Sequence, residues 1–123
     1  MTIIEAITNT DALKGNTCTM DQKINWLSRV DSMVKRLIID LHEGAEEAQF
    51  AGYGRDTDTE TVLLVPEPFD EMYIRYLEAM IDLTHGEIER YNNDMDLFNT
   101  AFQAYKAYYT RTHMPVRTKL RFF

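Results

Sequence analysis

The feature that most constrains this chain is the stretch between Pro66 and Pro115, where apolar residues recur at spacings of three and four. That period is typical of amphipathic helices that bury one stripe of side chains. We expect two long helices that form a hairpin, joined by a polar corner at residues 92–94. The first buried stripe comprises Tyr73, Leu77, Met80, Thr84, Glu87, Ile88 and Tyr91, and the second comprises Leu97, Phe98, Ala101, Phe102, Tyr105, Tyr108 and Tyr109.

The ends of these two helices follow from proline and from polar capping residues. Pro68 suits the opening turn of the first helix, because the amide hydrogen that proline lacks would have no partner there. Gly86 falls inside that helix at a cost of about 1 kcal/mol, but the stripe continues across it, so we predict one helix bent at Gly86. Asp94 or the residue before it should cap the second helix. That helix should end near His113, because Pro115 disfavours helical geometry in the preceding residue.

Two shorter helices are predicted upstream. Thr2 with Glu5, and Thr19 with Gln22, have the spacing of a capping box, in which a hydroxyl and a longer polar side chain satisfy backbone amides reciprocally. The polar run between these motifs should end the first helix, and Gly44 should end the second. The second helix carries a stripe of Ile24, Leu27, Val30, Val34, Leu37, Ile38 and Leu41.

The length and composition indicate one domain. A chain of 123 residues can bury a core without disulfides or metals, and its one cysteine, Cys18, cannot form an internal bridge. No apolar run approaches the roughly 20 residues of a membrane span, and the first ten residues lack the pattern of a signal peptide. We predict a soluble, unexported, all-α protein. It should be a small helical bundle built on the C-terminal hairpin, residues 1–115, with an acidic loop and an extended tail, residues 116–123.

The charge is unevenly distributed. Residues 111–123 carry four bases and no acid, so the net charge of −7 leaves −11 on the rest of the chain. Between Asp40 and Glu71 there are ten acids and one base, Arg55. This asymmetry favours a tail that binds an acidic partner and a body that repels nucleic acid. The alternative is a solvated loop followed by a disordered end.

The connection over residues 45–61 is long enough to be functional or mobile. Asp56, Asp58 and Glu60 alternate as the ligands of a calcium loop do, but Thr61 replaces the glycine that such a loop needs for its sharp turn. We therefore expect no metal here. The apolar residues 62–65 that follow have the composition of a short strand.

Catalytic signals are weak. The histidines His42, His85 and His113 are far apart in sequence and lack the helical spacing of a zinc site. Glu78 and Asp82 lie one helical turn apart, where acids usually face water. We predict neither an enzyme nor a bound cofactor.

Several motifs resemble a family of head-to-tail connector proteins, or adaptors, from tailed bacteriophages. They cover most of residues 20–115 and comprise KINWLS (23–28), HEG (42–44), LVPEPFDEMY (64–73), YLE (76–78), GEI (86–88), RYNN (90–93) and YTRTHMP (109–115). The resemblance implies a structural virion protein that assembles in the host cytoplasm. It also implies a ring, dodecameric in such adaptors, that binds the portal protein and a neighbouring connector or tail protein and extends the DNA channel. A soluble helical interaction module without a channel role is the alternative.

The residues themselves agree with this role at two places. An acidic rim of Asp56, Asp58 and Glu60 would repel phosphates, so DNA would pass without specific binding. After Pro115, bases alternate with mainly apolar residues at the period of a strand, which predicts a segment that docks on a partner. The predicted docking residues are Arg117, Lys119, Leu120, Arg121, Phe122 and Phe123. The many tyrosines of the hairpin suit either a half-buried core or an interface between copies.

Overall fold

The structure, a computed structural model, describes residues 1–47 and 49–116. These residues form the helices α1 (Ile3–Leu13), α2 (Met20–Leu37), α3 (Glu71–Thr84) and α4 (Ile88–Thr112), and the short 3-10 helices η1 (Ile39–Leu41) and η2 (Ala45–Glu47). The all-α prediction is confirmed, since these ranges contain isolated bridges but no β-strand. The strand predicted at 62–65 is wrong. The Leu64 and Val65 amides donate to the side chains of Asp31 and Tyr73 instead of to a neighbouring strand.

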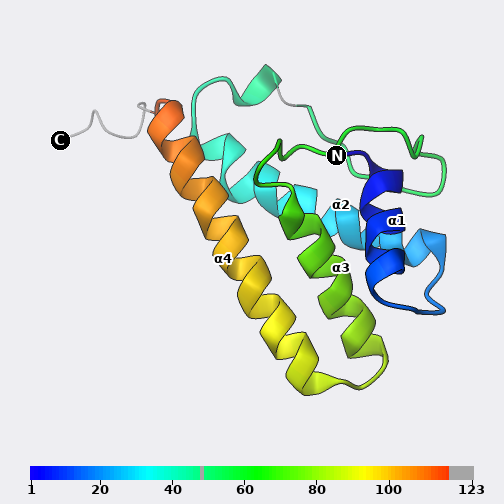
Figure 1. Cartoon of the computed structure of the whole chain (residues 1–123). Helices are drawn as coiled ribbons and strands as arrows, with labels where there is room; N and C mark the ends of the chain where they lie inside the picture. The colour runs from blue at the N-terminus through cyan, green and yellow to red at the C-terminus, as the bar shows by residue number, and fades with distance from the viewer. Residues whose placement is uncertain (48, 117–123) are drawn as a thin grey trace.

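Helix α3 lies at the centre of the bundle and packs against each of the other three α-helices. Figure 1 shows α3 and α4 side by side as an antiparallel hairpin, with α2 crossing α3 and with α1 on the side away from α4. The amphipathic stripes of all four helices meet in one core. Its members include Ile3, Ile7, Leu27, Val30, Val34, Ile38, Val65, Met72, Tyr73, Leu77, Ile81, Phe98, Phe102 and Tyr105.

The corner of the hairpin lies at residues 85–87, so the corner predicted at 92–94 is wrong, as is the bent helix across Gly86. Gly86 has φ +73°, in the left-handed region that favours glycine after the end of a helix. The Gly86 and Glu87 amides donate to the carbonyl oxygens of Leu83 (3.1 Å) and Asp82 (2.9 Å), which closes the turn. The apolar period continues in phase through this turn, but Ile88 is 53% exposed. Sequence spacing therefore could not reveal the break.

The other helix boundaries follow local hydrogen bonding. Both predicted capping boxes are present, at Thr2 and at Thr19. Helix α1 continues to Leu13 into the polar run that was expected to end it, because buried Thr10 donates its hydroxyl to the Ala6 carbonyl oxygen (2.8 Å).

Two further boundaries differ from the predictions. Helix α2 ends at Leu37, well before Gly44, and the chain then tightens into η1, which leaves Leu37 and Leu41 about half exposed. Pro68 does not open α3, which begins at Glu71; Pro68 lies in the turn that precedes the helix.

Asp31 joins α2 to the connection and to α3. Its fully buried carboxylate accepts hydrogen bonds from the Tyr53 hydroxyl (2.5 Å), the Tyr73 hydroxyl (2.6 Å) and the Leu64 amide (3.1 Å). Burial raises the pKa of Asp31, and this effect outweighs the three hydrogen bonds, each of which lowers the pKa. The tyrosine hydroxyls are held protonated, because burial and the neighbouring carboxylate raise the pKa of both. This network fixes an otherwise irregular segment, residues 53–65, against the helices.

Candidate functional site

The chain leaves α4 at a fixed place beside the end of α2. The Glu43 amide donates to the Met114 carbonyl oxygen (2.8 Å), and the Val116 amide donates to the Leu41 carbonyl oxygen (3.1 Å). An antiparallel bridge between His42 and Pro115 lies between these two bonds. The predicted docking residues Arg117, Lys119, Leu120, Arg121, Phe122 and Phe123 lie outside the described residues. The structure therefore shows where the tail begins.

Stacked rings hold this exit in place. His42 is buried, with its Nδ1 2.7 Å from the Ile38 carbonyl oxygen, to which it donates. The Tyr109 ring lies between the two histidines, 5.0 Å from His42 and 3.7 Å from His113, centroid to centroid. The two imidazoles, far apart in sequence, are thus 6.5 Å apart in the fold. The arrangement fastens the end of α4 to the end of α2, and its aromatic contacts give it a structural role.

The acidic loop predicted to line a channel is exposed. Asp56, Asp58 and Glu60 all face solvent, and one Asp58 carboxylate oxygen accepts from the Glu60 amide (2.9 Å). The amides of Ile3 and Ile4, which lack helical partners at the start of α1, donate to carbonyl oxygens at the end of this loop. In Figure 1 the loop lies beside α1, at the opposite side of the molecule from the end of α4.

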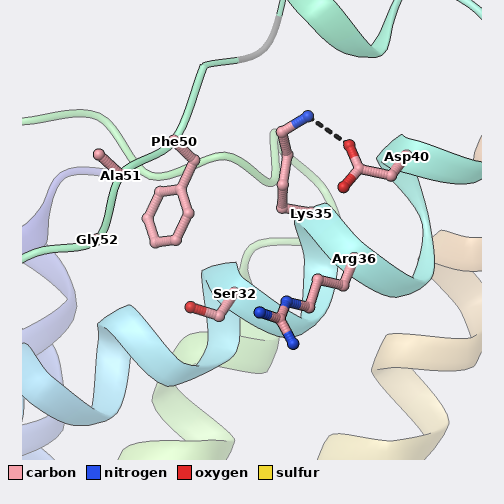
Figure 2. A pocket seen from close by; sticks show the side chains of 7 residues that line it. All are labelled: Ser32, Lys35, Arg36, Asp40, Phe50, Ala51 and Gly52. Carbon is pink, nitrogen blue, oxygen red and sulfur yellow. Dashed lines mark hydrogen bonds and ion pairs between the residues drawn. The ribbon is translucent and has the colours of Figure 1, made fainter.

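A shallow hollow of about 360 Å³ lies between α2 and the connection, lined by Ser32, Lys35, Arg36, Asp40, Phe50, Ala51 and Gly52. Figure 2 shows the Lys35 side chain turned toward Asp40, with the Phe50 ring above Ser32. The Lys35 ammonium is 2.5 Å from an Asp40 carboxylate oxygen and also donates to the Ala45 carbonyl oxygen (3.0 Å). Lys35 thereby holds the two 3-10 helices in place.

A second hollow, of about 290 Å³, adjoins the first along the outer face of α2. We call it the α2 groove; it is lined by Arg29, Ser32, Met33, Arg36 and Leu37. Arg29 and Arg36 are exposed, and neither forms an ion pair with the side chains of residues 1–46 and 49–116. Sequence reasoning concentrated on the buried stripe of α2 and missed this face. The sequence pattern could have indicated this face, since residues 29, 33 and 36 lie on one side of a helix.

The turn between α3 and α4 forms a second exposed surface, the hairpin tip, made of Leu83, Glu87, Ile88 and Glu89. Leu83 is 40% exposed and Ile88 is 53% exposed. Glu87 and Glu89 flank these apolar side chains, are themselves exposed, and form no ion pair in the part of the chain that the structure describes. The hairpin tip therefore presents two exposed apolar side chains next to two carboxylates, with exposed His85 and Arg90 in the same short segment.

Just inside the tip, a lysine from the end of α1 joins two acids of the hairpin. The Lys14 ammonium lies 2.5 Å from an Asp82 carboxylate oxygen and 3.7 Å from one of Asp94. Asp82 is 2% exposed, contrary to the expectation that it faces water; Lys14 compensates for its burial. Burial, together with the neighbouring Asp82, raises the pKa of Asp94 to about 6. Within the described residues, no group of three or more His, Cys, Asp or Glu side chains is placed to hold a metal ion.

Comparison of the chain with protein-family models, with curated proteins and with solved structures gives no match. None of the helices in the described ranges is long and apolar enough to cross a membrane.

Proposed function

We propose that this protein is a structural virion component that forms an adaptor ring between the portal and the tail of a bacteriophage and extends the DNA channel. The motifs that resemble connector proteins, from KINWLS at 23–28 to YTRTHMP at 109–115, motivate this proposal. The structural observation that carries it is the exposed apolar flank of α4.

Helix α4 is too exposed to serve only the core of one copy. Of its 25 residues, only Phe98, Phe102 and Tyr105 are buried. Beside that buried face, along the border with α3, lies a second apolar stripe at helical spacing, with Leu97 48% exposed. This flank stripe comprises Leu97, Ala101, Ala104 and Tyr108, the first three of which line a hollow beside Glu71 and Arg75 on α3. Ala101 is partly buried, whereas Leu97, Ala104 and Tyr108 are exposed. A contiguous exposed apolar stripe on a long helix is typical of a surface that associates with another protein.

The positions of the tail and of the acidic loop, at opposite sides of the fold, also support a ring. The tail begins beside η1 at one side of the molecule, whereas Asp56, Asp58 and Glu60 lie at the other side (Figure 1). A single copy could thus bind the portal with residues 117–123 while its acidic loop faces the DNA channel. In a ring, exposed carboxylates along the channel would repel the phosphates of passing DNA.

The assembly test is mass photometry of the purified chain, alone and mixed with the portal protein of the same virion. We expect a closed ring, at least when the portal is present as a template. A chain that lacks residues 117–123 should lose portal binding but keep its thermal stability. A strictly monomeric protein under both conditions, or a two-fold dimer, would favour the alternative of an interaction module without a channel role.

The channel role is tested by changing the charge of the acidic loop. Replacing Asp56, Asp58 and Glu60 with Lys should leave the free energy of unfolding within about 0.5 kcal/mol, because all three are exposed. Particles that carry this triple change should eject DNA slowly or retain it. A neutral variant, with Asn, Asn and Gln at these positions, should fall between the two. Normal ejection from the lysine particles would count against the channel role.

A further inference from the structure

The α2 groove is a basic surface on an acidic chain. Arg29 and Arg36 lie two helical turns apart and flank Met33, with exposed Leu37 at one end. Arginine and methionine are enriched at protein interfaces, where the guanidinium pairs with carboxylates and the thioether fits irregular apolar surfaces. The groove therefore fits a partner with an apolar centre and acidic edges.

The hairpin tip has that chemistry. Its exposed Leu83 and Ile88 are of a size to lie over Met33, and Glu87 and Glu89 supply the carboxylates. Arg29, Arg36, Glu87 and Glu89 form no ion pair with the described side chains, those of residues 1–46 and 49–116. The two surfaces are therefore complementary, with arginines on one, glutamates on the other and apolar side chains on both.

The two surfaces of one copy cannot meet. Asp31 lies between Arg29 and Met33 in the sequence, and its buried carboxylate accepts a hydrogen bond from Tyr73 in the first turn of α3. The α2 groove therefore lies at the level of the start of α3. The hairpin tip follows the other end of α3, about 20 Å away at a rise of about 1.5 Å per residue. Figure 1 shows the same separation, with the α3–α4 turn far from the C-terminal half of α2.

We propose that the hairpin tip of one copy docks in the α2 groove of the next, so that copies associate head to tail. Because the contact joins two different surfaces, it is heterologous and generates a ring where the rotation closes. The inference rests on the proposed adaptor ring and names the contact that would order its copies. A second copy fits the groove better than nucleic acid does, since the apolar Met33 separates its two arginines, Leu37 adds apolar surface at one end, and the chain has a net charge of −7.

Charge reversal on each surface tests the contact. The groove variant carries Arg29→Glu and Arg36→Glu, and the tip variant carries Glu87→Arg and Glu89→Arg. In sedimentation velocity at low salt, each should raise the protein concentration needed for half-association by about tenfold or more. The exposed Arg111, outside both surfaces, provides the control, and Arg111→Glu should associate like the unaltered protein.

Mixing the variants distinguishes a heterologous contact from general repulsion. The groove variant keeps a working tip that fits the working groove of the tip variant, and the reversed tip of the one complements the reversed groove of the other, so an equal mixture should regain the association that each variant alone has lost. A chain that carries all four reversals should associate again. Association of both variants at the unaltered concentration, or no recovery in the chain with four reversals, would overturn the proposal. If the groove variant loses only the binding of a short DNA duplex, the groove is a nucleic-acid site and the proposal is likewise wrong.

A disulfide trap reports the contact even where association is weak. In a Cys18→Ser background, Met33→Cys together with Ile88→Cys should give a ladder of cross-linked chains under mild oxidation. The matched control pairs Met33→Cys with Val62→Cys, a 67% exposed position that lies beside Thr2 at the opposite end of α1 from the tip, and should give no ladder. If rings form on the portal but the ladder is absent, the adaptor role stands and this contact is wrong. If no ring forms on the portal although the ladder appears, the contact stands and the adaptor role is wrong.

Discussion

Removing the carboxylate of Asp31 should strongly destabilise the fold, because three donors depend on it. Asp31→Ala leaves the buried Tyr73 hydroxyl without its acceptor, although that oxygen still accepts from the Val65 amide (2.8 Å). It also frees the Tyr53 hydroxyl and the Leu64 amide, both in partly buried surroundings. The connection would then lose its main attachment to α2.

The magnitude follows from the burial of each donor. A fully buried donor left unsatisfied costs about 1–3 kcal/mol, and the loss of each partly buried bond costs about 0.5–1.5 kcal/mol. The three together amount to about 2–6 kcal/mol. Burial of the carboxylate, which raises the pKa of Asp31, offsets part of this, so we expect about 2–4 kcal/mol of net destabilisation. That is a large share of the roughly 5–15 kcal/mol that stabilises a typical domain.

Urea unfolding followed by circular dichroism measures this change. With a slope of about 1–3 kcal/mol per molar urea, the midpoint should fall by at least about 0.7 M. Asp21→Ala is the matched control, since it makes the same chemical change on α2 at an exposed residue paired with exposed Arg55. The control should stay within about 0.5 kcal/mol of the unaltered protein. An Asp31→Ala protein as stable as the control would refute the assigned role of the network.

Three further predictions concern local features. Gly86→Ala should lower the free energy of unfolding by about 1 kcal/mol because φ there is +73°, whereas Gly54→Ala should change it by less than about half as much; equal effects in urea titrations would contradict the assigned turn. Thr2→Ala should cost about 1 kcal/mol by removing the α1 cap, which thermal melts would detect. The pKa of Asp94 is raised from 3.8 to about 6, so its protonated form favours folding, and this contribution is complete below about pH 4 and is lost as the pH rises through 6. Asp94→Asn should therefore exceed the unaltered protein in stability at pH 7 and match it near pH 4, and a parallel pH dependence of the two proteins would contradict this.

Much of the candidate site could not be predicted, because its residues are joined only through space. The α2 groove and the hairpin tip consist of side chains that the core leaves exposed, and a search for buried stripes passes over them. The cluster of His42, Tyr109 and His113 joins residues more than 60 positions apart. The acidic loop could be identified by composition alone, yet its place beside α1 depends on hydrogen bonds from the first amides of that helix.

By itself, the sequence determined the features that act over one or two turns of chain. The capping boxes at Thr2 and Thr19 and most of the apolar stripe of α2 depend on neighbours three and four residues apart, so local spacing suffices to find them. In the stripe predicted for α3, only Tyr73 and Leu77 are buried, because the partners of that helix decide which of its faces is covered. Only the tertiary structure decided where the hairpin turns. The apolar period runs on through Gly86, and the break there is closed by the Gly86 and Glu87 amides, which donate to α3 carbonyl oxygens and let α4 pack back along α3. The same is true of Asp31, whose burial is tolerable only because Tyr53, Leu64 and Tyr73 converge on it from two other segments.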